Sequence, residues 1–331
     1  MVALLHPSIE AGELAEQRGD FLEASSAFEA ALEDHDPLVV ATARNCLGKL
    51  AWRQGAHDVA FASFEKARAI AIRHSAVDIR ARAELGLGNV YYGRGDYVRA
   101  RELYDGVRNS ATTTGLRAKA MLNLGIIANI AGDAGAAEGH YRRACHAFTD
   151  AEDIHGQAQS HHNLGMLHAD RLELDEAEAA YREALLLSEK TGNREMAGLV
   201  LMNQSRLSCA MEQYDQAVAR CDDALAILAE MGAEVLRGTT LRWKGRAQRY
   251  LGQLSESERT LTEATRIARR TRARLLEAEA MHELGATHRE AGNHGAARKW
   301  LRSALAIFAA LGAAAEAGAV KAELSALADD D

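Results

Sequence analysis

The chain has 331 residues, a formal net charge of −8 and four cysteines. The acidic balance argues against a protein that binds nucleic acid, and no stretch reaches the roughly 20 apolar residues of a membrane span. The cysteines form no close pairs, and the first ten residues, MVALLHPSIE, lack the pattern of a secretion signal. We therefore expect a cytoplasmic protein with neither a nucleic-acid nor a membrane partner.

The composition predicts an all-α fold. Alanine is abundant, and no segment shows the sustained alternation of β-branched and polar residues that marks a strand. The two prolines, Pro7 and Pro37, both stand ahead of predicted helices, where a missing backbone N–H costs nothing. Arginine is used far more often than lysine, which favours a bacterial source.

One pattern of small and bulky residues returns about every 40 residues along the chain. Each copy is anchored by a small residue, usually the glycine of a Leu-Gly pair: Gly12, Gly48, Gly88, Gly125, Gly165, Ser205, Gly245 and Gly285. A larger residue follows sixteen positions later, in order Phe28, Phe64, Tyr104, Tyr141, Tyr181, Cys221, Leu261 and Leu301. Twelve positions after the anchor stands an alanine, or Ser257 in the seventh copy. The chain therefore holds eight copies.

This spacing predicts a hairpin of two helices in each copy. Small residues let two helix backbones approach to roughly 8–10 Å, and the larger residue fills the space beside them. Glycine closes the first helix in six copies, at Gly19, Gly55, Gly95, Gly132, Gly252 and Gly292. In chain order we expect hairpins at 6–32, 40–72, 80–109, 117–148, 157–189, 197–231, 238–269 and 278–311. One hairpin cannot bury its apolar face alone, so neighbours must stack into a curved solenoid.

The last segment completes the predicted architecture. Residues 313–327 are predicted to form one amphipathic helix that covers the exposed edge of the eighth hairpin, and 328–331 form an acidic tail. Stacked repeats need such a cap to stay soluble. We therefore expect one solenoid domain over 1–312, followed by a capping helix and tail over 313–331.

Two segments carry the pattern most clearly, LGNVYYGRGDYVRARELYDGV at 87–107 and LGMLHADRLELDEAEAAYREA at 164–184. They resemble the tetratricopeptide repeats, whose leucine-glycine, tyrosine, turn, alanine, aromatic and alanine positions they match. The long period is similar to that of Pins-type spindle adaptors, kinesin light chains and bacterial regulators of the Rap and MalT kinds. This resemblance implies an α-solenoid wound as a right-handed superhelix that serves as a binding scaffold. Departures from the pattern fall at Gln204-Ser205, Cys221, Lys244-Gly245 and Leu261, where regular packing is less firmly predicted.

Catalytic and metal-binding motifs are absent from the sequence. It contains no GxSxG elbow, no HExxH pair and no glycine-rich phosphate loop between a strand and a helix. His161 and His162, with His155 nearby, are too far along a helix from His168 to share one metal ion with it. His168 and His288 replace a tyrosine or an alanine of other copies and are expected in the core. We therefore predict no catalytic residue, no metal, no cofactor and no enzymatic activity.

Asparagine recurs on the first helices of three hairpins. Asn123, Asn163 and Asn203 each stand two positions before an anchor, on the side expected to face the concave groove. The asparagine amide both donates and accepts hydrogen bonds, so a row of such residues can hold the backbone of an extended peptide. Peptide-binding members of the resembled family support this use. Alternatively, each asparagine bonds the adjoining helix and stabilises the stack.

A group of arginines and aromatic residues is predicted on the same groove. Arg242, Arg246 and Arg249 share one stripe of the seventh hairpin beside Trp243 and Tyr250, with Arg206 before them and Arg289 after them. Guanidinium groups flanked by aromatic rings suit carboxylates or phosphates. The alternative is internal pairing with Glu279, Glu283 and Glu290. Because three glutamates cannot neutralise five arginines, we favour an anionic partner.

These observations predict a non-catalytic scaffold that binds a protein or peptide, preferably an extended acidic segment, in the concave groove. The alternative is a regulatory sensor, similar to the Rap and MalT kinds, that changes superhelical shape when a small peptide or metabolite binds. The first hairpin is acidic and the seventh basic, so weak head-to-tail association of a monomer is the most self-association that we expect.

Overall fold

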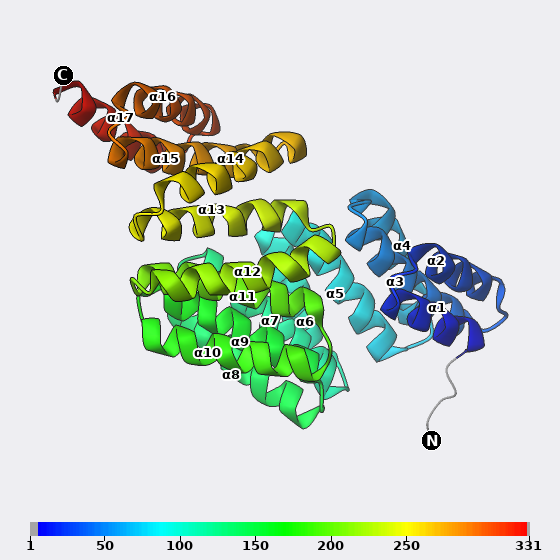
Figure 1. Ribbon diagram of the computed structural model, residues 1–331. Helices are drawn as coiled ribbons and strands as arrows, with labels where there is room; N and C mark the ends of the chain where they lie inside the picture. Colours follow the sequence, from blue (N-terminus) through cyan, green and yellow to red (C-terminus); the bar gives the residue numbers. More distant parts are fainter. Residues whose placement is uncertain (1–5, 330–331) are drawn as a thin grey trace. The chain divides into compact units, whose positions relative to one another are not determined.

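A computed structural model describes residues 6–329, and every regular element among them is helical. Figure 1 shows successive helices joined by short turns. The elements are α1 (Pro7–Gln17), α2 (Phe21–Ala30), η1 (Ala31–Glu33), α3 (Pro37–Arg53), α4 (His57–Arg73), α5 (Val77–Gly93), α6 (Tyr97–Ser110), α7 (Thr114–Ile130), α8 (Ala134–Asp150), α9 (Ile154–Asp170), α10 (Leu174–Lys190), α11 (Arg194–Ala210), α12 (Tyr214–Glu230), α13 (Glu234–Tyr250), α14 (Leu254–Thr271), α15 (Arg274–Glu290), α16 (His294–Leu311) and α17 (Ala314–Asp329). The predicted all-α solenoid is confirmed.

The chain divides into two compact units, one ending at Asn163 and the other beginning at Leu164, inside α9. Within each unit, neighbouring helices pack as hairpins, and the first helices of successive hairpins also contact one another. The chain of first-helix contacts runs through α3, α5 and α7 in the first unit and through α11, α13 and α15 in the second. First helices that approach their successors lie on the inner side of the stack, which is where the sequence predicts a groove.

The repeating pattern has its physical cause in the fit between each anchor and the larger residue of the same hairpin. A Cβ atom added to Gly88 would lie 2.4 Å from Cε1 of Tyr104, so that only glycine lets the ring approach the backbone of α5. The same contact recurs in the pairs Gly12–Phe28, Gly48–Phe64, Gly125–Tyr141, Gly165–Tyr181, Gly245–Leu261 and Gly285–Leu301. The glycine at the anchor and the bulk sixteen residues later are therefore one packing device.

The sixth hairpin keeps this fit by exchanging both partners. Ser205 replaces the glycine and Cys221 replaces the aromatic residue, and both are fully buried. The Ser205 hydroxyl donates to the Met202 carbonyl at 2.7 Å, and the Cys221 thiol donates to the Thr240 carbonyl at 3.5 Å. Burial raises the pKa of Cys221 to about 12. A slightly larger anchor facing a smaller partner fills the same space, so the departure from the pattern leaves a closed core.

The turns inside the hairpins adopt the left-handed backbone conformation. Glycine occupies this position in the six hairpins for which the sequence predicts it. The fifth and sixth hairpins instead place Leu172 (φ 61°) and Glu212 (φ 59°) there. A left-handed residue with a side chain costs on the order of 1–2 kcal/mol, so these two turns carry strain that the glycine turns avoid.

Helix α17 covers the last hairpin with an apolar face. Ala317, Val320 and Leu327 are buried in one cluster with residues of α15 and α16, including Met281 and Phe308. The helix extends to Asp329, so 328 and 329 continue it rather than beginning the predicted tail, and Asp330 and Asp331 lie outside the described residues.

Candidate functional site

The candidate site lies in the second unit on α13, where arginines and aromatic rings alternate. The guanidinium carbon of Arg242 lies 4.1 Å from the ring centroid of Trp243. Arg246 lies 5.5 Å from the Trp243 centroid and 5.8 Å from that of Tyr250. Arg249 lies 4.4 Å from the Tyr250 centroid. Cations held over aromatic faces lose freedom before any ligand arrives, so the cluster is preorganised.

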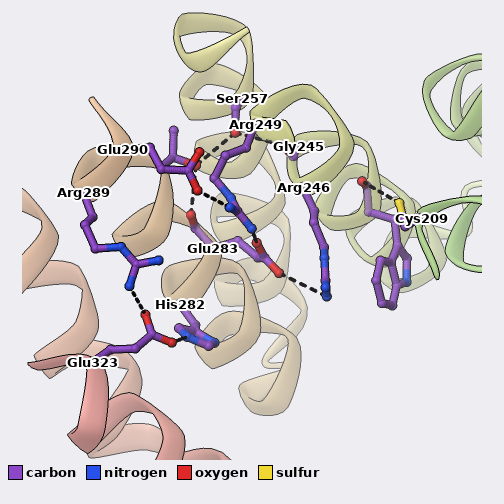
Figure 2. A network of polar contacts seen from close by, with 12 residues as sticks. Cys209, Gly245, Arg246, Arg249, Ser257, His282, Glu283, Arg289, Glu290 and Glu323 are labelled. Carbon is purple, nitrogen blue, oxygen red and sulfur yellow. Dashed lines mark hydrogen bonds and ion pairs between the residues drawn. The ribbon is translucent and has the colours of Figure 1, made fainter. Parts of the chain in front are cut away.

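The same arginines pair with glutamates of α15. Arg242 lies 3.3 Å from Glu279, and Arg246 lies 3.7 Å from Glu283. Arg249 is held between Glu283, at 3.1 Å, and Glu290 (Figure 2). Its side chain is only 7% exposed. The alternative of internal pairing, left open by the sequence, is therefore what the structure shows for these three residues.

Two further carboxylates pair with the outer arginines. Neither belongs to the eighth hairpin, whose glutamates were the only ones counted from the sequence. Glu323 of α17 accepts from Arg289 at 3.2 Å and lies 2.7 Å from Nε2 of His282 (Figure 2). Asp170, at the end of α9, lies 3.4 Å from Arg206. The premise that three glutamates must neutralise five arginines is therefore wrong, because five carboxylates share that task.

Burial and pairing shift the pKa of several of these groups. Burial lowers the pKa of Arg242 below its ordinary value despite the nearby Glu279. Burial alone would also lower the pKa of Arg249, but the charges of Glu283 and Glu290 outweigh it and raise that pKa. The hydrogen bond from His282 holds the pKa of Glu323 below its usual range. Arg249 and Glu323 are therefore both held in their charged forms by their partners.

An apolar hollow adjoins the arginines on α11 and α13. Its volume is about 230 Å³, and its lining comprises Ala169, Leu172, Leu174, Arg206, Leu207, Cys209, Ala210, Trp243 and Arg246. The thiol of Cys209 lies 3.9 Å from the Trp243 carbonyl (Figure 2). Burial raises the pKa of this thiol to about 11. We call this feature the α11–α13 hollow.

Tyr214 extends the aromatic part of the cluster. Its ring stacks on that of Tyr250 with centroids 4.6 Å apart and planes 5° from parallel. Sequence reasoning missed Tyr214, Asp170, Glu323 and the leucines of the hollow. Only Leu172 leaves a signal that could have found it, since it stands where most hairpins have a turn glycine.

The predicted row of asparagines is divided between the two units. The amide of Asn123 donates to the side-chain oxygen of Asn89 at 3.1 Å, and the same oxygen accepts from the Tyr104 hydroxyl at 2.7 Å. Asn123 therefore has the stacking role that the sequence left as an alternative. Asn163 closes the first unit and Asn203 belongs to the second, so a continuous ladder across them stays a prediction.

Two histidines of the predicted core pair with glutamates. His168 and His288 are buried, as the sequence predicts, and pair with Glu173 at 2.6 Å and with Glu258 at 3.7 Å. Over residues 6–329, no three His, Cys, Asp or Glu side chains are grouped so that they could hold a metal ion. In the same range no helix is both long enough and apolar enough to cross a membrane.

Several solved structures share the fold at low sequence identity. A signal-transduction ATPase with numerous domains and a tetratricopeptide repeat sensor, from Pyrococcus horikoshii, matches with a TM-score of 0.68 and 14% identity. The match covers 94% of this chain but 49% of that protein, so this chain spans about half of its length. A Rap protein complexed with competence and sporulation factor matches at 0.62 and 12% identity, covering 97% of this chain and 95% of the other.

Aspartyl phosphate phosphatase F from Bacillus subtilis matches at 0.57 and 11% identity, covering 99% and 96% of the two chains. No curated protein sequence matches this chain. Three family models, each described as tetratricopeptide repeat, match residues 39–105 and 236–310, 85–152, and 157–191. Together with the glycine-anchored hairpins, these matches show that the chain belongs to the tetratricopeptide repeat family.

Proposed function

We propose that this chain is a non-catalytic scaffold whose second unit binds a segment of a protein or peptide on the inner side of α11, α13 and α15. A preference for acidic side chains is part of the proposal. The observation that carries it is the position of Arg206 and Arg246, whose side chains are 34% and 37% exposed and both line the α11–α13 hollow.

These two arginines also have the longest ion pairs of the cluster, 3.4 Å to Asp170 and 3.7 Å to Glu283. The Arg206–Asp170 pair is partly exposed on both sides and contributes at most about 1 kcal/mol, so a ligand carboxylate can replace Asp170 at low cost. Glu283 is buried, but it keeps Arg249 as a partner when a ligand binds Arg246. Arg249, by contrast, is held by two carboxylates and is almost fully buried. The acidic preference therefore rests on Arg206 and Arg246, while Arg242 and Arg249 keep α13 in place.

The setting that we propose is the cytoplasm. All four cysteines are free, and burial raises the pKa of each thiol. The pKa rises to about 12 for Cys46 and Cys221 and to about 11 for Cys209. Thiols with a raised pKa react slowly, and free thiols are typical of a reducing compartment.

A random decapeptide display library, selected on the immobilised full chain, tests the proposal. We expect selected peptides to be enriched in Asp and Glu, and this enrichment to vanish for the double variant Arg206→Gln, Arg246→Gln. The matched control is Arg259→Gln, Arg302→Gln, which removes the same charge from exposed positions of α14 and α16. Equal enrichment with both double variants, or no enrichment with the unaltered chain, contradicts the acidic preference.

A second candidate is a regulatory sensor that changes shape on binding a small peptide or metabolite. The fold shared with a tetratricopeptide repeat sensor and with a Rap protein bound to competence and sporulation factor favours it. Small-angle scattering of the full chain, with and without a selected peptide, separates the two candidates. A change in the radius of gyration at saturation supports the sensor, and an unchanged radius supports the scaffold.

A further inference from the structure

The α11–α13 hollow differs from the rest of the arginine cluster because its walls are apolar. Apart from Arg206 and Arg246, its lining consists of aliphatic side chains, the buried thiol of Cys209 and the indole of Trp243. Its volume of about 230 Å³ lies below the range of roughly 300–1,000 Å³ that is common for sites of drug-sized ligands. The hollow is therefore large enough for about one large side chain.

Leu172 at the hollow is unusual in two respects. It is 77% exposed, and its backbone is left-handed, with φ at 61°. The turn would be relaxed by glycine, which most other hairpins have at this position. Leu172 therefore buries little of its surface within the chain, and its side chain is available to a partner.

We propose that the α11–α13 hollow receives one large apolar side chain of the bound segment, while an acidic residue next to it in the segment meets Arg206 and Arg246. The occupant is thus a peptide with adjoining aromatic or aliphatic and acidic residues. This inference rests on the proposed function and adds the apolar anchor to it. The indole of Trp243 and the side chain of Leu172 form opposite kinds of wall, one aromatic and stacked with arginines, the other aliphatic and exposed.

The charge of the lining argues for this occupant over a purely apolar one. Both arginine side chains are partly exposed, and Arg246 lies between the rings of Trp243 and Tyr250. A ligand that filled the hollow without a carboxylate would remove water from these cations and leave them only their long ion pairs to Asp170 and Glu283, which is costly. A ligand with only a carboxylate would leave the apolar walls in contact with water. A ligand that carries both an apolar side chain and a carboxylate avoids both of these costs.

Four capped decapeptides in a Gly-Ser background test the inference, with central pairs Phe-Glu, Ala-Glu, Phe-Gln and Ala-Gln. Their binding to the full chain is followed by Trp243 fluorescence in a Trp52→Phe, Trp300→Phe background. We expect the Phe-Glu peptide to bind best, with a loss of roughly tenfold or more when Phe is replaced by Ala. Equal affinities of Phe-Glu and Ala-Glu overturn the apolar anchor but leave the proposed function standing. Equal affinities of Phe-Glu and Phe-Gln instead overturn the acidic preference.

Leu172→Gly is the decisive variant because it should not harm folding. It relaxes the strained turn, so the melting temperature should stay the same or rise, while the preference for Phe over Ala falls severalfold. Glu212→Gly is the matched control, since it relaxes the equivalent turn of the next hairpin and does not line the hollow. A Phe preference that survives Leu172→Gly, or that Glu212→Gly reduces equally, overturns the inference.

Filling the hollow provides an independent variant. Ala210 is exposed at the end of α11 and lines the hollow, so Ala210→Phe should abolish the preference for Phe over Ala in the peptide. Ala229→Phe, at an exposed position near the end of α12, is the control and should leave that preference intact. Tight binding of 3-phenylpropanoate, equal to that of the Phe-Glu peptide, would overturn a peptide occupant in favour of a small carboxylate.

Discussion

Replacing Gly88 by alanine tests the packing that repeats along the chain. The added Cβ would lie 2.4, 2.8 and 2.9 Å from three ring carbons of Tyr104. That ring cannot swing away freely, because Tyr104 is buried and its hydroxyl donates to Asn89 at 2.7 Å. Relief therefore requires either a shift of α6 away from α5 or the loss of this hydrogen bond.

The expected cost follows from opposing contributions. Overpacking a filled core costs about 1–3 kcal/mol, and losing the Tyr104 hydrogen bond costs about 1 kcal/mol more. Alanine in place of glycine inside a helix stabilises the helix by roughly 0.5–1 kcal/mol, which offsets part of this cost. We therefore expect Gly88→Ala to lower the free energy of unfolding by about 1–3 kcal/mol.

Gly106→Ala in α6 is the matched control, since it belongs to the same hairpin. No atom lies within 4 Å of the Cβ that it would add, so only the helix-propensity gain of roughly 0.5–1 kcal/mol remains. Urea unfolding followed by far-ultraviolet circular dichroism should move the two midpoints in opposite directions. The midpoint is the quantity to compare, because repeat arrays can unfold in parts. If both variants shift the midpoint equally, the close approach of ring and glycine does not stabilise the hairpin.

Three further outcomes are expected. Ala177→Leu overpacks the buried contact of the fifth hairpin and should lower stability by about 1–3 kcal/mol. Ala179→Leu, at an exposed site of the same helix, should change stability by under about 0.5 kcal/mol. Similar melting temperatures for the two variants would contradict close packing at Ala177. Burial lowers the pKa of His162 to about 4. Its contribution to stability is therefore full above pH 6.5 and is lost as the pH falls toward 4, by up to about 3 kcal/mol, and His162→Gln should flatten the unfolding free energy measured across that window. Dialysis against a chelator should leave the melting curve unchanged, and a marked loss of stability would reveal a metal site that the histidine spacing does not predict.

The fold could be predicted from the sequence because the pattern of a small anchor and a larger residue sixteen positions later occurs eight times. A single glycine sixteen residues before an aromatic residue would carry little information, but Gly88–Tyr104 and its equivalents recur with the same geometry. The exchange at Ser205 and Cys221 shows the limit of that reasoning. Compensation between two positions is visible only once the two side chains are seen in contact.

The electrostatics of the site could not be predicted in the same way. The partner of Arg206 is Asp170, at the end of α9 in the preceding hairpin, and the partner of Arg289 is Glu323, on the final helix. Counting charges within neighbouring repeats misses both, since pairing depends on how far each long side chain reaches across the stack. Leu172 was likewise hidden, because the missing glycine marks an unusual turn without showing that it adjoins a hollow.

Glu323 has a consequence for how the array ends. The Glu323 carboxylate pairs with both Arg289 and His282. Glu323 lies on α17, the helix that also supplies Val320 and Leu327 to the last apolar cluster. Without α17, the eighth hairpin would present an arginine and a histidine above an uncovered apolar surface. The capping helix thus keeps the apolar face of α15 and α16 from serving as a contact surface for other chains.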